Sequence, residues 1–349
     1  MAPWHQSAPW RYLALGSLLF FMPLLLLVAP WGAASTPWQT AGLAGQSVRH
    51  VATGFADGLF FYYAWTPSEG LLQASASAPN QNIERSMWRP IDGALPGRGV
   101  WGAPEVRRLV VDSHNGRHVL ITLAAGNQSG LYGSNDGGAS WQLMRSFAGS
   151  QQNPVVALGP LGAMYLADNQ RLLLNLGGGS LWQQTPTWRE TLGTATAILA
   201  SEGGSAGAIE QTQTQPQLLL GTTAGYILRL PSALADHWEE SRLLTQGAVT
   251  LLAEASAHPD ALYAWGERTL FASADAGASW AAVFQAAAGD EAQALAVAAD
   301  DPLTLYLALT RTGVMVSHDG GQAWQLVNGG LRHGDVHALT VDRRSGGYL

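Results

Sequence analysis

The chain has 349 residues, 47% of them hydrophobic and 12% charged, with 41 glycines and 17 prolines, a composition typical of a globular β-rich protein that buries a large core and turns often. Its formal net charge is −7 and its sequence contains no lysine, which argues against a general nucleic-acid binder, since such a protein needs a basic face, and excludes a Schiff-base lysine. The absence of cysteine excludes disulfides, thiolate nucleophiles and cysteine-ligated zinc.

The first predicted element is an N-terminal apolar helix over residues 13–30. No charged residue occurs between Arg11 and Arg49, and small residues follow at 32–35. This pattern predicts an export signal within residues 1–34. Two alternatives remain open: a cleaved signal peptide that releases a secreted protein, or an uncleaved anchor that crosses the cytoplasmic membrane through residues 13–30. Both place the rest of the chain outside the cytoplasm.

From about residue 36 to 349 the chain consists of repeated units. Each unit has short apolar runs with period-two alternation, as in residues 292–327, which predicts four strands per unit. The units align on tryptophans spaced by 41 to 56 residues, a period typical of propeller blades: Trp88, Trp141, Trp182, Trp238, Trp280 and Trp324. We therefore expect an all-β protein, a β-propeller of four-stranded blades over residues 36–349.

The ends of the chain decide the number of blades. Residues 35–43 resemble the last strand of a unit and residues 336–349 resemble the first two. Together they predict three quarters of a seventh blade, in which residues 37–43 pair with 336–342 and remove an open strand edge. Seven blades is therefore the main expectation and six the alternative.

Three units share the pattern Ser-x-Asp-x-Gly-x-x-Trp, at residues 134–141, 273–280 and 317–324. In each, Ser and Asp can satisfy the backbone of a tight turn, Gly can adopt a positive φ, and Trp can bury its ring. One carboxylate per turn is too few for a calcium loop. We therefore assign a structural role to these residues: Ser134, Asp136, Gly138, Trp141, Ser273, Asp275, Gly277, Trp280, Ser317, Asp319, Gly321 and Trp324.

This pattern resembles the Asp-box, or BNR repeat. Asp-box propellers include sialidases, xyloglucan-active hydrolases, sortilin-type receptor ectodomains and photosystem II assembly-factor-like propellers. The resemblance implies that each box is the hairpin between the third and fourth strands of a blade. It also implies that a ligand site lies on the opposite face, where the first strands of the blades begin.

Candidate ligand-binding residues follow from this placement. An alignment of the starts of the first strands puts polar side chains at several equivalent positions, and the loop 93–105 adds two possible lid residues. Convergent arginines can hold a carboxylate or a phosphate. The candidates are Arg49, Arg107, Arg108, Gln293, His337, Arg98 and Trp101.

Signatures of catalysis fail specific tests. The resemblance to sialidases implies three carboxylate-binding arginines and an Arg-Ile-Pro type motif, but His50 and Val51 follow Arg49 and no third arginine occupies the aligned row. We expect a non-catalytic extracytoplasmic module that binds a protein or a glycan, with no catalytic residue, metal or cofactor. The alternative is a divergent glycoside hydrolase, sialidase-like or xyloglucanase-like.

Overall fold

The computed structural model describes most of the chain beyond residue 46. The described residues are 43, 47–78, 83–96, 105–112, 114–125, 128–147, 153–159, 162–168, 170–176, 181–201, 217–231, 235–242, 247–255, 258–298, 301–329, 331 and 336–340. Of the two compact units, Met1–Thr36 and Pro37–Leu349, the first lies wholly outside them, as does the predicted apolar helix. Within the described ranges no helix is both long and apolar enough to cross a membrane.

The described part of Pro37–Leu349 contains six four-stranded antiparallel sheets, which we call blades 1 to 6. Blade 1 consists of β1 (His50–Ala56), β2 (Leu59–Thr66), β3 (Gly70–Ala76) and β4 (Arg89–Pro90). Blade 2 consists of β5 (Glu105–Val111), β6 (Val119–Ala124), β7 (Gly130–Ser134) and β8 (Gln142–Ser146). Blade 3 consists of β9 (Val155–Leu158), β10 (Met164–Asp168), β11 (Arg171–Asn175) and β12 (Gln183–Gln184).

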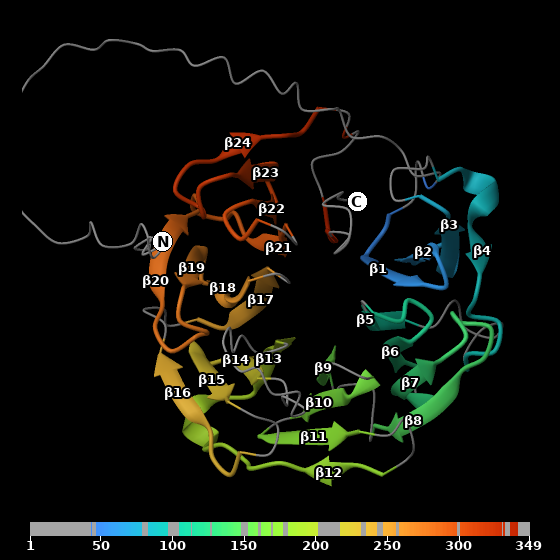
Figure 1. Cartoon of the computed structure of the whole chain (residues 1–349), viewed down its shortest axis with the longest axis horizontal. Coiled ribbons are helices and arrows are strands. Elements are labelled where there is room, and N and C mark those ends of the chain that lie inside the picture. The colour runs from blue at the N-terminus through green and yellow to red at the C-terminus, as the bar shows by residue number, and fades with distance from the viewer. Residues whose placement is uncertain are drawn as a thin grey trace, which may run out of the picture. The chain divides into compact units, whose positions relative to one another are not determined.

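Blade 4 consists of β13 (Ala195–Ser201), β14 (Gln217–Thr222), β15 (Tyr226–Leu230) and β16 (Glu239–Arg242). Blade 5 consists of β17 (Val249–Ala255), β18 (His258–Gly266), β19 (Thr269–Ser273) and β20 (Ala281–Gln285). Blade 6 consists of β21 (Ala292–Val297), β22 (Leu305–Leu309), β23 (Gly313–Ser317) and β24 (Gln325–Leu326). The blades surround a common axis, with the first strand of each innermost (Figure 1). The chain is thus an all-β propeller, as its sequence predicts.

The core lies between neighbouring blades. Strand β2 places Phe61, Tyr63 and Trp65 in one apolar cluster with residues of β6, whereas Tyr62 belongs to a different cluster. This division follows from the period-two alternation of side chains along a strand. The same alternation in the second strands of the other blades builds clusters between blades 2 and 3, 3 and 4, 4 and 5, and 5 and 6. Each blade is therefore held mainly by its neighbours.

The expectation of seven blades is wrong: the described residues form six sheets. Residues 336–340 belong to no strand, and residues 37–42 of the predicted partner strand lie outside the described residues. Val336 and Leu339 instead pack against apolar side chains of blade 6. The Thr340 hydroxyl lies 3.3 Å from the hydroxyl of Thr53 in β1. Residues 336–340, here named the closing segment, thus contact both blade 6 and blade 1.

The three boxes connect the third and fourth strands of blades 2, 5 and 6. In blade 2, the Gly138 N–H donates to Ser134 Oγ at 2.8 Å, and Ser134 Oγ donates to Asp136 Oδ1 at 2.8 Å. The Asp136 carboxylate also accepts hydrogen bonds from the backbone and the hydroxyl of Ser140. Blades 5 and 6 repeat the bonds from the serine and the glycine. The serine and aspartate side chains of each box therefore satisfy the hydrogen-bonding groups of their own turn.

The tryptophans of the middle blades bond to the preceding blade. Trp141 Nε1 donates to the Ile91 carbonyl at 2.8 Å, Trp182 Nε1 to the Met144 carbonyl at 3.2 Å, and Trp238 Nε1 to the Pro186 carbonyl at 2.7 Å. Trp280 and Trp324 bond instead within their own boxes. Trp182 and Trp238 follow sequences without the full box pattern. The hydrogen bond of each to the preceding blade explains why tryptophan occurs at these positions.

Candidate functional site

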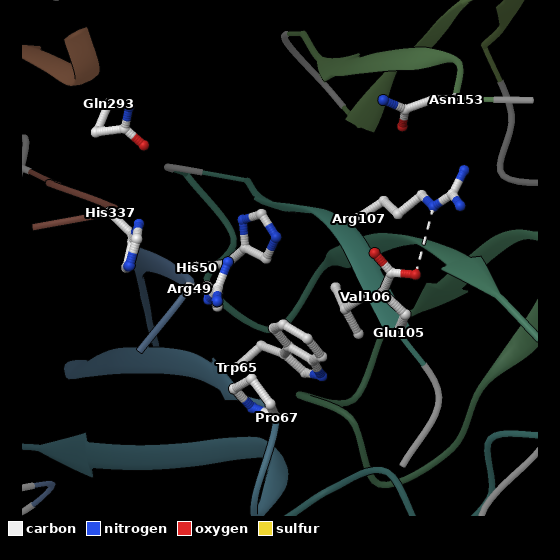
Figure 2. Close-up of a pocket in the computed structure, with 10 residues that line it drawn as sticks. All are labelled: Arg49, His50, Trp65, Pro67, Glu105, Val106, Arg107, Asn153, Gln293 and His337. Carbon is white, nitrogen blue, oxygen red and sulfur yellow. Dashed lines mark ion pairs between the residues drawn. The ribbon is translucent and has the colours of Figure 1, made fainter. Parts of the chain in front are cut away.

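A pocket lies where the innermost strands begin. Because the strands of a blade are antiparallel, the first strand starts at the end opposite the turn that follows the third strand. The pocket therefore opens on the face opposite the boxes. It has a volume of about 660 Å³, and ten residues line it (Figure 2): Arg49, His50, Trp65, Pro67, Glu105, Val106, Arg107, Asn153, Gln293 and His337.

Three blades, the start of a fourth and the closing segment supply these side chains. Arg49 and His50 stand at the start of β1, and the Arg49 N–H donates to the Trp65 carbonyl at 2.9 Å, which joins the ends of β1 and β2. Arg107 lies in β5 and Gln293 in β21. A pocket built this way depends on the arrangement of the blades rather than on one loop.

Four of the seven candidate residues meet in this pocket: Arg49, Arg107, Gln293 and His337. Arg108 is not among its lining residues. Arg98 and Trp101 lie outside the described residues. The structure therefore brings together the candidates taken from the aligned strand starts, apart from Arg108.

Other lining residues were absent from the candidate set. Trp65 lies near the end of β2, Pro67 directly follows that strand, and Asn153 precedes β9. Glu105 begins β5 and lies two positions before Arg107. Position relative to the strand ends is the signal that identifies all four, because loops between the second and third strands open on the same face as the strand starts.

Positive charge dominates the pocket. Among the described residues that line it, two are arginines and one, Glu105, is a carboxylate. The Glu105 Oε2 atom lies 3.9 Å from Arg107 Nε (Figure 2), and the glutamate side chain is 62% exposed. A pair this long and this exposed stabilises little. Arginine guanidinium groups at such a place are suited to bind an anionic group of a ligand.

His50 is neutral at the pH of most compartments. Its pKa is lowered to about 4, mainly by burial and next by the charge of Arg108, with smaller contributions from Arg49 and His337, whereas a hydrogen bond with the Val106 backbone opposes the shift. The His50 ring also lies against Trp65, with ring centroids 5.9 Å apart. Burial is therefore the largest cause of the neutral state of His50, and the neighbouring cations act in the same direction.

We expect this histidine to make stability depend on pH. Because the His50 pKa is lower in the folded state, stabilisation by its neutral form is complete above the unfolded pKa of 6.5. It is lost as the pH falls toward 4, because the unfolded chain binds a proton that the folded chain does not. We expect a loss of about 2 kcal/mol over this window, after allowance for partial exposure. Urea unfolding at pH 7, 5.5 and 4 measures it.

His50→Asn should flatten this dependence by a similar amount. His258→Asn is the matched control, because the His258 side chain is exposed, and this variant should keep the pH profile of the wild type. A His50→Asn profile parallel to that of the wild type would show that His50 binds its proton equally in both states.

Comparisons with known proteins identify the fold. No family model and no curated protein match the sequence. Among solved structures, YCF48 bound to D1 peptide is 15% identical with a TM-score of 0.56, over 84% of each chain. The GH74 xyloglucanase from Xanthomonas campestris is 17% identical with a TM-score of 0.62, over 88% of this chain and 51% of that one.

The extracellular domain of the hybrid two component system BT4673 from B. thetaiotaomicron is 14% identical with a TM-score of 0.58, over 87% of this chain and 37% of that one. The chain thus spans about half of the xyloglucanase and less than half of the BT4673 chain. Identities this low show the fold alone. The chain is a β-propeller of the kind found in these proteins.

Proposed function

We propose that this chain is a non-catalytic, extracytoplasmic binding or assembly module that holds an acidic segment of a protein partner in the pocket. The observation that carries the proposal is the placement of Arg49 and Arg107, from two different blades, around one pocket in which Glu105 is the one carboxylate among the described lining residues. Arginine guanidinium groups bind carboxylates in bidentate geometry. Arg49 and Arg107 are far apart in the sequence but line the same pocket, an arrangement that suits the binding of a separate ligand molecule.

A protein partner fits the pocket better than a glycan does. Glycan sites commonly offer an exposed aromatic face on which a sugar stacks, whereas Trp65 is only 8% exposed. Asn153 and Gln293 can bond to a peptide backbone, since an amide group both donates and accepts. The propeller of YCF48 is bound to a peptide, which supports a protein partner by analogy of fold.

Hydrolysis of a glycan is the rival function, which we consider because the xyloglucanase has a similar fold. Most glycoside hydrolases need two carboxyl groups on either side of the scissile bond. The pocket supplies only Glu105 among the described residues that line it. Sequence tests for sialidase motifs also fail at Arg49. These observations favour binding over hydrolysis.

We further propose that the three boxes are Asp-box repeats and that residues 1–34 direct export. The repeated bonds of Ser134, Ser273 and Ser317 to their aspartates, each 2.8 Å long, support the first assignment. The apolar run 13–30 supports the second, and the extracellular BT4673 propeller is consistent with it. Mass spectrometry of the mature N-terminus distinguishes a secreted protein from an anchored one.

The binding experiment uses a defined probe. A fluorescein-labelled peptide rich in Asp and Glu, with a free C-terminus, is titrated with the protein and followed by fluorescence anisotropy. An amidated peptide with Asn and Gln in place of Asp and Glu is the neutral comparison. We expect the acidic peptide to bind more tightly, and its affinity to fall with salt because exposed charges are screened.

The double variant Arg49→Gln, Arg107→Gln should weaken binding of the acidic peptide by about 10- to 100-fold, because two charge-assisted contacts are lost. Arg145→Gln, Arg171→Gln changes the net charge equally but alters β8 and β11, away from the pocket, and should bind as the wild type does. Equal binding by both double variants would contradict the proposal. Hydrolysis of xyloglucan or a sialyl substrate that the first double variant abolishes would establish the rival.

A further inference from the structure

The charged side chains are distributed unevenly around the pocket. Glu105 and Arg107 both belong to β5 of blade 2, and the Glu105 Oε2 atom lies 3.9 Å from Arg107 Nε. Arg49 directly precedes β1 of blade 1, and Figure 2 shows it on the other side of the pocket, with His337 and Gln293. One side of the pocket therefore holds a cation and a carboxylate close together, whereas the other side holds an arginine.

Glu105 is accessible to a ligand in the pocket. Its side chain is 62% exposed, and that of Arg107 is 24% exposed. The 3.9 Å between their charged atoms is too long for a hydrogen bond, and an ion pair this exposed adds little to stability. A ligand can therefore contact the Glu105 carboxylate with little cost to the fold.

Glu105 affects which ligands suit Arg107. A ligand carboxylate that binds Arg107 comes close to Glu105, because the two charged groups of the protein are 3.9 Å apart. This is well within the Debye length of about 8 Å in physiological salt, so the two carboxylates repel each other. A basic group of the ligand beside Glu105 adds an attraction that offsets this repulsion. The pair therefore favours a ligand in which an acidic group stands next to a basic one.

We propose that Glu105 makes the pocket specific for an acidic segment in which a lysine or arginine stands beside one of the acidic residues. The carboxylate of that acidic residue contacts Arg107, the ligand cation contacts Glu105, and a further acidic residue contacts Arg49. This inference rests on the proposed function and deepens it, because it states the charge pattern of the partner segment. A segment with acidic residues alone binds less tightly, since its charge faces that of Glu105.

Two fluorescein-labelled peptides of identical composition test the proposal by fluorescence anisotropy with the full-length protein. Both are rich in Asp and Glu and contain one lysine. The paired peptide has the lysine two positions after a central acidic residue, where both side chains project to the same side of an extended chain. The spaced peptide has it at one end, away from the acidic residues. The wild type should bind the paired peptide about three- to fivefold more tightly, as expected for an exposed charge pair.

Substitution of Glu105 should change this preference in a defined direction. Glu105→Gln should bind both peptides equally, and Glu105→Lys should bind the spaced peptide more tightly. Glu84→Gln is the matched control, because it changes the net charge as Glu105→Gln does, at an exposed side chain that makes no capping hydrogen bond and does not line the pocket. It should keep the preference of the wild type.

Equal binding of the two peptides by the wild type would overturn the proposal, and so would an undiminished preference in Glu105→Gln, since another residue would then recognise the lysine. The double variant Arg49→Gln, Arg107→Gln separates this inference from the proposed function. If that variant loses both peptides while Glu105→Gln behaves as the wild type, the proposed function stands and the specificity of Glu105 is wrong. If that variant binds both peptides as the wild type does, the two proposals fail together.

Discussion

Gly138→Ala is expected to lower the free energy of unfolding by about 3 kcal/mol. Gly138 has a φ of +90°, which an L side chain rarely adopts, and this alone costs about 1 kcal/mol. A Cβ atom there would also lie 2.4 Å from Cδ1 and 2.9 Å from Cβ of Ile91, a buried residue of blade 1. Relief of that overlap requires Ile91 and the blade contact to shift, which costs a further 1 to 3 kcal/mol.

The same substitution at other glycines should cost less, in an order set by the space around the added Cβ atom. A Cβ on Gly277 would lie 2.8 Å from Leu219 Cδ2, and one on Gly321 would lie 3.1 Å from Val283 Cγ2. Gly58, in the turn between β1 and β2, has a φ of +77° with no atom within 4 Å of the added Cβ. We expect alanine to destabilise in the order Gly138, Gly277, Gly321, Gly58, as measured by urea unfolding. Equal costs at Gly138 and Gly58 would show that backbone strain, not the blade contact, requires glycine in the box.

The box glycines show why the blades were predictable from the sequence. A turn that must satisfy its own backbone, adopt a positive φ and touch the preceding blade leaves few choices of residue at fixed offsets. The pattern therefore recurs at Gly138, Gly277 and Gly321 and marks the turn between the third and fourth strands. Local chemistry of this kind is visible in one sequence.

The number of blades was not predictable in the same way. Residues 336–342 have the alternation of a first strand, but a strand also needs hydrogen-bonded partners, and alternation does not supply them. In the structure, Leu339 packs against blade 6 as an apolar side chain should, while residues 336–340 join no sheet. The alternation is thus compatible with the packing of the partly buried Leu339, whereas the predicted pairing of residues 336–340 as a strand is wrong.

The positions of the candidate site residues were also predictable only in part. Arg49, Arg107, Gln293 and His337 meet because strand starts converge around the axis, and the repeat alignment captures strand starts. Arg108 follows Arg107 directly, but side chains alternate along a strand and the β5 to β6 register shifts between Val106 and Arg108. Arg107 lines the pocket, whereas Arg108 donates a hydrogen bond to the Thr196 carbonyl of blade 4 at 3.4 Å. A β-bulge of this kind has no clear signature in the sequence.

Leu339→Asp is expected to lower the free energy of unfolding by about 3 kcal/mol. Leu339 packs against Ala294, Ala308 and Val314, and also against a second cluster that contains Tyr306 and Val316. The substitution removes apolar burial and places a carboxylate without a partner against the inner strands of blade 6. Urea unfolding at pH 7 measures the loss, since the introduced aspartate is charged there.

Leu326→Asp is the matched control, because it is the same substitution in blade 6 itself, at a side chain that is 57% exposed. It should change stability by no more than about 0.5 kcal/mol. If the two variants are equally stable, the closing segment contributes nothing to the ring. If Leu339→Asp is the less stable by the expected margin, the closing segment stabilises blade 6 by covering an apolar face that would otherwise be exposed.

The same segment also contributes His337 to the pocket and Thr340 to the contact with Thr53 of blade 1. Closure of the ring and assembly of the pocket then depend on one stretch of five residues, so Leu339→Asp should also weaken binding of the acidic peptide although its side chain does not line the pocket.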